Sequence, residues 1–217
     1  MVAPQLPVSA NEAFNSVTQF ALATIHIVDY AAPDATRPAG MVRLSTPDTE
    51  ELTAELDGAS DWLGVPSDEL LLAALARTIA KTLGDGIVPV DVASERGSML
   101  DAVPLLCATS QQADATAMLG GVHRLLTSAT ERIADGMSEV YFNYLGEVSE
   151  DSVPVPVQEA PPGLGHALEL RIYRTADRVH VDWWYDSSHF EPYTVEELAE
   201  QFPLALFEMT TDALPAK

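Results

Sequence analysis

The sequence predicts one α/β domain in which helices pack on a mixed β-sheet. Segments with apolar residues at helical spacing alternate along the chain with short segments rich in β-branched and aromatic residues. Near the C-terminus, residues 168–173 and 178–185 show the two-residue alternation of a β-hairpin. Of the 217 residues, 47% are hydrophobic, so the chain can bury a core of its own.

Residues 1–40 are expected to form an irregular lead-in with one strand. Four prolines are spread over this part of the chain, which argues against regular elements over most of it. Residues 20–30 are predicted to form the strand, because Ile25 and Ile27 carry β-branched side chains. The first strand of the domain itself is expected over residues 41–44.

Two helices are expected next. For the first, Thr46 is predicted as the N-cap, with Pro47 at the first helical position and Gly58 at the end. The second is predicted over residues 67–83, where Ser67 provides the cap and leucines at helical spacing form one apolar stripe. The central part of the chain therefore begins with two packed helices.

The alternation continues through the middle of the chain. Residues 87–92 are predicted to form a strand, and residues 119–134 an amphipathic helix. A further strand is predicted over residues 139–145, ending before Gly146. Helices and strands therefore alternate through this half of the chain, as expected of an α/β fold.

The second strand of the C-terminal hairpin is expected to have two different faces. One face carries Val179, Val181, Trp183 and Tyr185. The opposite face carries Arg178, His180, Asp182 and Trp184. His180 is therefore expected on a polar surface rather than in the core. The final helix is predicted to begin at a capping box of Thr194 and Glu197, and Pro203 should kink it.

The chain is strongly acidic, with 33 Asp and Glu residues against 11 Lys and Arg and a formal net charge of −22. The sequence has no cluster of lysines and arginines that could bind a phosphate backbone, so we expect neither nucleic acid nor a membrane as partner. We also expect no signal peptide and no membrane span. The lone Cys107 forms neither an intrachain disulfide nor a cysteine-based zinc site. A cytoplasmic protein without metal or cofactor is the resulting expectation.

Residues 140–146 carry the most specific motif of the chain, Val-Tyr-Phe-Asn-Tyr-Leu-Gly. They resemble the Phe-Asn-Tyr-Leu-Gly strand of the condensation and epimerization domains of nonribosomal peptide synthetases. In the order of that family, residues 68–76 resemble its leading core helix and residues 88–92 a following strand. Residues 166–206 resemble its closing hairpin and final helix, so the resemblance covers residues 41–214.

The resemblance implies a fold of the chloramphenicol-acetyltransferase-like kind. In that family two similar lobes form one enzyme, and substrates on carrier-protein arms enter a tunnel between the lobes. All the matching segments belong to the C-terminal lobe. Residues 41–214 are therefore expected to form a single lobe, and the lobe that carries the active-site motif His-His-x-x-x-Asp-Gly is missing from this sequence.

The histidines of the chain do not supply that motif elsewhere. None of the five is followed four residues later by aspartate, and no two are adjacent. In the family's Gly-His-Gly-Arg segment, Glu95 stands where the histidine would fall, and residues 102–105 only echo its Phe-Thr-x-x-x-Pro strand. The second histidine of the active-site motif is thought to position or deprotonate the acceptor nucleophile, which needs a pKa near neutrality. The family's chemistry is therefore not expected from this chain alone.

Two histidines remain as candidates for catalysis. His189 follows an aspartate and two serines directly, but a catalytic triad is assembled from distant segments, and a solvated loop is the alternative. His166 follows Gly165 in a Gly-x-Gly sequence that lacks the later glycine and the preceding strand of a phosphate-binding loop.

Several side chains are candidates for an interface or for a tunnel that holds an acyl or peptidyl chain. Aromatic residues on strands are more often part of the core, and Tyr141 and Trp184 are the aromatics expected to be exposed. Tyr144 is a further candidate. Asn143 is expected to hydrogen-bond the backbone at the lobe junction.

Charge restricts the partner. Carrier proteins in such pathways are usually acidic, so their approach requires the few arginines of this chain. Arg171, Arg174 and Arg178 lie close together in the predicted hairpin and are expected to form that contact.

These observations predict a stand-alone half-domain in nonribosomal peptide or related secondary-metabolite biosynthesis. It is expected to be non-catalytic alone and to pair with a complementary lobe, a synthetase module, a carrier protein or a second copy of itself. The alternative is a small acyltransferase or hydrolase that uses His189 or His166 on carrier- or CoA-bound acyl groups. The start at Met1 and the loose C-terminal tail favour a natural small protein over a piece of a longer synthetase.

Overall fold

The computed structural model describes residues 23–31, 40–93, 100, 103–130, 138–148, 165–175 and 178–215. Over these residues the elements are β1 Met41–Thr46, α2 Glu50–Leu63, α3 Ser67–Thr82, β2 Gly86–Val92, β3 Val103–Cys107, α4 Ala115–Ser128, β4 Val140–Glu147, β5 Leu168–Thr175, β6 Arg178–Asp186 and α6 Pro192–Asp212. The predicted α/β class is confirmed. Glu95 and most of the predicted lead-in lie outside the described residues.

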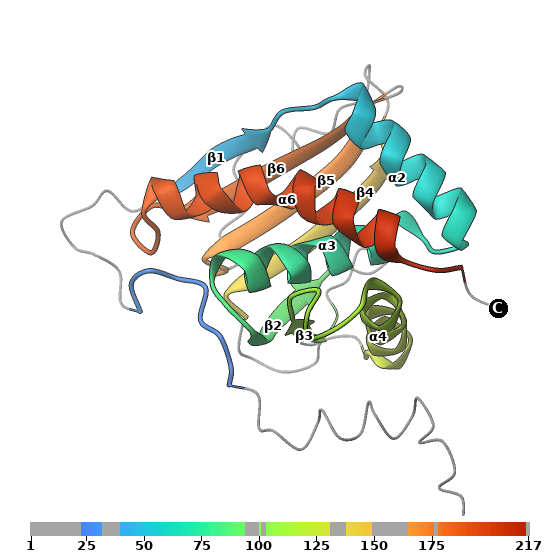
Figure 1. The fold of residues 1–217 in the computed structure, drawn as a ribbon. Helices are drawn as coiled ribbons and strands as arrows, with labels where there is room; N and C mark the ends of the chain where they lie inside the picture. The colour runs from blue at the N-terminus through green and yellow to red at the C-terminus, as the bar shows by residue number, and fades with distance from the viewer. Residues whose placement is uncertain are drawn as a thin grey trace, which may run out of the picture.

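The strands form one mixed sheet in the order β1-β6-β5-β4-β2-β3. The three middle strands β5, β4 and β2 run parallel to one another. At one edge of the sheet β6 pairs antiparallel with β5 and with β1, and at the other edge β3 pairs antiparallel with β2. The β5–β6 hairpin is confirmed, with Leu168 opposite Tyr185 and Thr175 opposite Arg178. Helices α3 and α6 lie across one face of the sheet, flanked by α2 and α4 (Figure 1).

The core lies between this face and the helices. The predicted inward set of β6 is buried throughout, and the Trp183 ring meets Phe202 of α6 edge-on at 5.7 Å between ring centroids. Helix α3 differs from the prediction of one apolar stripe, because every residue from Glu69 to Ala80 is buried. The small side chains on its other faces let α6 and α4 pack closely around it.

The start and end of α2 differ from the prediction. Its N-cap is Thr49, whose hydroxyl accepts a hydrogen bond from the Leu52 amide at 3.1 Å. Thr46 is not the cap, because its hydroxyl is buried in β1 and binds Trp183 and α6 instead. Gly58 lies within the helix, which ends at Leu63; its C-cap is Gly64, in the left-handed conformation with φ of 65°.

The other predicted caps are also different. Ser67 is the first residue of α3 and Pro66 occupies the cap position without a side-chain bond. The Thr194 hydroxyl donates to Asp29 instead of capping α6, which begins two residues earlier. For Thr194, a tertiary contact with the segment before β1 therefore takes the place of local capping.

Two further boundaries move. Helix α4 begins four residues earlier than predicted, capped by the Asp114 carboxylate, which accepts from the Ala117 amide at 2.7 Å. It ends at Ser128, and residues 131–134 of the prediction lie outside the described residues. Strand β4 continues through Gly146, where φ is 65° and the register with β5 shifts. Glycine permits this bulge, so it does not end the strand.

The predicted strand over residues 20–30 is wrong for its described part. Residues 23–31 form a single bridge, in which the Ile25 amide donates to the Ile87 carbonyl at 2.9 Å. The next inward amide, that of Ile27, donates to the Glu139 carboxylate at 2.8 Å, so a side chain replaces the backbone partner that a strand requires. The Ile27 side chain is nevertheless part of the core.

Candidate functional site: the polar face of the sheet

The face of the sheet opposite α6 carries polar side chains, because residues alternate between the two faces along each strand. We call this the polar face; its members are Arg43, Ser45, Tyr141, Asn143, Glu169, Arg171, Tyr173, His180, Asp182 and Trp184. Three of its charged residues are buried, with Glu169 and Arg171 each 3% exposed and Asp182 1% exposed. Buried charges need partners, and each of these has one.

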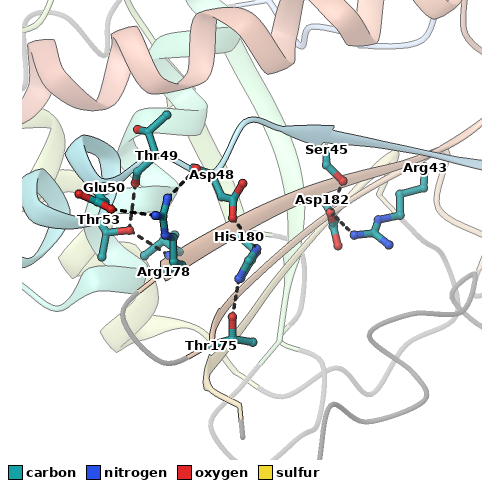
Figure 2. Close-up of polar contacts among 11 residues, drawn as sticks. Arg43, Ser45, Asp48, Thr49, Glu50, Thr53, Thr175, Arg178, His180 and Asp182 are labelled. Atoms are coloured by element: carbon teal, nitrogen blue, oxygen red, sulfur yellow. Dashed lines mark hydrogen bonds and ion pairs between the residues drawn. The ribbon is translucent and has the colours of Figure 1, made fainter. Parts of the chain in front are cut away.

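Asp182 joins β6 to β1. Figure 2 shows its Oδ1 atom accepting from the Arg43 guanidinium at 2.9 Å and from the Ser45 hydroxyl at 2.6 Å. The neighbouring Tyr173 is partly removed from water, and this burial, together with the Asp182 carboxylate, raises the pKa of its hydroxyl. Asp182 therefore links the polar side chains of β1 to those of β6.

Glu169 and Arg171 form a second buried pair, 3.1 Å apart between Oε1 and Nε. The Asn143 amide lies 3.4 Å from the same Glu169 oxygen, so this asparagine binds a side chain and not the predicted backbone group. The Trp184 ring lies between Arg171 and Arg43, whose guanidinium carbons are 5.5 and 5.9 Å from its centroid. Trp184 is only 6% exposed, so the prediction that it is exposed is wrong.

A third buried cluster lies at the ends of β2, β4 and β5. The Asp91 carboxylate accepts from the amide and hydroxyl of Ser138, at 3.1 and 3.0 Å, and lies 2.8 Å from His166 Nε2. Because a carboxylate accepts, Nε2 carries the proton. Tyr141 stacks on the imidazole at 5.0 Å, and burial, followed by the charge of Glu169, raises the pKa of its hydroxyl. Tyr141 is half-buried.

This cluster contains the residue types of a catalytic triad in a different arrangement. In a triad the serine bonds histidine and the histidine bonds aspartate, whereas here the Ser138 hydroxyl bonds Asp91 directly. The His166 side chain is 4% exposed. The arrangement holds the ends of three strands together. It shares one feature with acid–base sites, an imidazole that a carboxylate orients.

His189 lies in the turn between β6 and α6. Its Nδ1 atom is 2.9 Å from the carbonyl oxygen of Tyr30, so it donates to the segment before β1. The Ser188 amide and hydroxyl both donate to Asp186; although burial raises the pKa of this carboxyl, these bonds hold it below the ordinary value. Aspartate and serine thus bond each other, and His189 faces another segment.

The three arginines of the hairpin are separated. Arg171 lies on the polar face, whereas Arg174 points to α2 and forms two bonds with Asp57, at 2.5 and 2.7 Å. This pairing lowers the pKa of the Asp57 carboxyl. Arg178 binds Glu50 at 2.9 Å, as Figure 2 shows. Each arginine is therefore paired with a carboxylate of its own chain.

Two more side chains complete the placement of the predicted residues. Tyr144 is half-buried and packs against the core. His180 lies on the polar face as predicted, where it stacks on Tyr173 at 4.9 Å and its Nε2 is 2.5 Å from the Thr175 hydroxyl.

Sequence reasoning missed two acidic members of these clusters, Asp91 and Glu169. Asp91 stands between two valines and Glu169 between two leucines, within strands that are otherwise mostly apolar. An acid at an apolar strand position needs a buried partner, and this was the available signal. The partners come from other strands, so the sequence does not name them.

Among the described residues, no group of His, Cys, Asp or Glu is arranged to hold a metal ion. In the same part of the chain, none of the helices has the length and apolar character needed to cross a bilayer.

No family model matches the sequence. One of the subunits of the phenolphthiocerol/phthiocerol polyketide synthase from Mycobacterium tuberculosis is 33% identical over 245 aligned residues, which cover 90% of this chain. Its counterpart from Mycobacterium bovis is similar to the same extent. The chain spans about 16% of the length of these relatives.

Solved structures with similar folds are condensation-type domains. The epimerization domain from the third module of tyrocidine synthetase B has a TM-score of 0.56 and 15% identity, over 92% of this chain and 54% of that one. The condensation domain of the enacyloxin polyketide synthase has a TM-score of 0.58 and 16% identity, over 83% and 43%. The EpoB cyclization-docking bidomain of Sorangium cellulosum has a TM-score of 0.60 and 10% identity, over 93% and 48%. This chain therefore has the fold of condensation-type domains, over about half the length of such a domain.

Proposed function

We propose that this chain is a condensation-domain-like half-domain that acts in polyketide or nonribosomal peptide biosynthesis in the cytoplasm. Its similarity to part of a polyketide synthase and its condensation-type fold support this assignment. We further propose that it is not catalytic alone and works by contacting another lobe, a synthetase module or a carrier protein.

The placement of the candidate histidines supports the non-catalytic role. The His166 side chain is only 4% exposed and its ring binds Asp91, so little of the imidazole faces solvent. His189 uses Nδ1 to bind the Tyr30 carbonyl. Both side chains thus serve contacts between segments, and this observation carries the proposal.

The test is a binding experiment with a recombinant lobe that contains His-His-x-x-x-Asp-Gly, taken from a neighbouring reading frame in the native genome. Sedimentation of the mixture should show a complex of one lobe with one copy of this chain. Condensation activity should appear in the mixture and be absent from either component. A compact monomer that leaves the second lobe unbound would contradict the pairing.

Carrier-protein contact has its own test. Arg174 and Arg178 are the hairpin arginines with appreciable exposure, at 21% and 37% of their side chains. Reversing the charge of Arg178 to glutamate should weaken binding of an acidic carrier protein, and Arg171→Glu is unsuitable because that residue is buried. Unchanged affinity of the Arg178→Glu variant would remove this contact from the proposal.

The buried Asp91–His166 pair keeps one enzymatic alternative open, an acyltransferase or hydrolase acting on carrier- or CoA-bound acyl groups. Acyl transfer from a CoA thioester should then depend on His166, and a His166→Gln variant should lose it. A His189→Ala variant tests the second histidine in the same assay. Absence of activity, or activity that neither substitution changes, excludes this alternative.

A further inference from the structure

The two edges of the sheet differ in how they meet solvent. An edge strand presents unpaired amides and carbonyls, which another chain can extend into a longer sheet. At the β3 edge, Pro104 stands opposite Pro89 in the register with β2. Neither proline has an amide hydrogen, so this pair cannot exchange backbone bonds, and the nitrogen of Pro104 falls at an outward position. Because Pro104 has no amide hydrogen to donate to an added strand, it disfavours the pairing of another strand with β3.

The β1 edge has no such protection. The Ser187 amide of the β6 side donates to the Gly40 carbonyl, so the even-numbered residues of β1 bond to β6. The amides and carbonyls of the odd-numbered residues Met41, Arg43 and Ser45 therefore point away from the sheet. Among the described residues no strand pairs with them.

The side chains of β1 leave this edge accessible. Arg43 and Ser45 are exposed, and Val42 is 40% exposed on the face nearer α6. Arg43 and Ser45 direct their side chains to Asp182, as Figure 2 shows. An extended segment laid along β1 would meet Val42 and Leu44 with every second side chain.

Charge identifies the kind of segment. Helix α6 runs beside β1, and its residues include five acids and neither lysine nor arginine. The Glu196 carboxylate lies close enough to Tyr185 to contribute to the raised pKa of that phenol, after burial, and Tyr185 is the β6 partner of Val42. A second copy of this chain would bring a second acidic α6 against the first, at a net charge of −22 for each copy. A basic partner is attracted to the same rim.

We propose that the outer edge of β1 binds an extended, net-basic segment of another protein, which adds a strand to the sheet. Backbone bonds to Met41, Arg43 and Ser45 provide the affinity, and apolar residues beside Val42 and Leu44 with flanking lysines or arginines provide the selectivity. This inference deepens the proposed interaction role by naming a surface, and it rests on that role.

The test uses the whole chain and a synthetic peptide, Lys-Val-Thr-Val-Thr-Lys, with Glu-Val-Thr-Val-Thr-Glu as the matched control. In NMR hydrogen exchange, the lysine peptide should protect the amides of Met41, Arg43 and Ser45. The amides of Val42 and Leu44 already bond to β6 and should not change, so they are an internal control. The glutamate peptide should give no protection, and added salt should weaken the lysine peptide's binding.

A backbone variant gives an independent readout. Met41→Pro removes one outward amide at the start of β1, where the preceding Gly40 tolerates proline, and should weaken the lysine peptide about tenfold. Met41→Leu should bind as the natural sequence does. Protection at Val42 instead of Arg43, equal binding of both peptides, or a dimer in sedimentation without peptide would overturn the proposal. Peptide binding without any lobe complex would instead refute the proposed pairing and leave the edge site standing.

Discussion

Single buried side chains hold the polar clusters together, and Asp91 is the clearest case. Replacing His166 by alanine leaves the buried Asp91 carboxylate with one donor fewer, which should cost about 3 kcal/mol of unfolding free energy. His123→Ala removes a comparable bond to Glu69, but its ring is 60% exposed, so the cost should stay below about 1 kcal/mol. Urea unfolding followed by fluorescence measures both. Similar losses in the two variants would mean that Asp91 is not held by His166.

Cys107 should be chemically inert while the chain is folded. Burial raises the pKa of its thiol to about 12, so the reactive thiolate is scarce at pH 8. Iodoacetamide at pH 8 should label it slowly in buffer and quickly in concentrated urea, where the pKa returns to its ordinary value. Rapid labelling of the folded protein would show that the end of β3 opens to solvent.

The site was less predictable from the sequence than the elements. Alternation along the hairpin correctly placed His180 and Trp184 on the face opposite Trp183, because period-two patterns are local. It did not show that Trp184 lies between two guanidinium groups, since Arg43 comes from a strand about 140 residues away in the sequence. A side chain's burial depends on such distant neighbours.

At the scale of elements, β1 and α6 are joined by a hydrogen bond from Thr46 to the carbonyl of Ala199. Pro203 lies inside α6 and has no amide to bond the carbonyl of Ala199, one turn earlier. The Thr46 hydroxyl donates to that carbonyl at 3.2 Å and accepts from the Trp183 indole at 2.9 Å. A threonine that the sequence marks as a helix cap is thereby used to satisfy the gap left by a proline.

Thr46→Val should therefore cost about 2 kcal/mol or more, because it leaves a buried donor and a buried acceptor without partners. Thr49→Ala, which removes the actual cap of α2, should cost about 1 kcal/mol. Pro203→Ala should partly rescue Thr46→Val by giving the Ala199 carbonyl a helical donor. Denaturation of the two single variants and the double variant measures the coupling, and strictly additive costs would rule it out.

Element types were predictable and their limits were not. The hydrophobic spacing that predicts α3 and the hairpin lies within each segment, so it needs no knowledge of the fold. Thr46 and Thr194 have the right chemistry for caps, yet both hydroxyls bind other segments. Capping signals compete with tertiary contacts, and only the assembled sheet shows which of them is satisfied.

At the scale of the molecule, the charge should control stability. A net charge of −22 on 217 residues produces self-repulsion in the folded state that dissolved ions screen. Raising sodium chloride from about 20 mM to about 0.5 M should therefore increase the thermal unfolding midpoint. Glucose at equal osmolality is the control for nonionic effects. A midpoint that falls with salt would show that the internal ion pairs outweigh the repulsion.

The position of β1 in the sheet also sets an order of events during folding. Its one described neighbour is β6, and Met41 pairs with Asp186 across most of the chain's length. On the ribosome, β1 and α2 emerge long before the hairpin that receives them, so they must wait as an unpaired strand and a loosely held helix. The sheet can therefore be completed at β1 only after β6 has been synthesised.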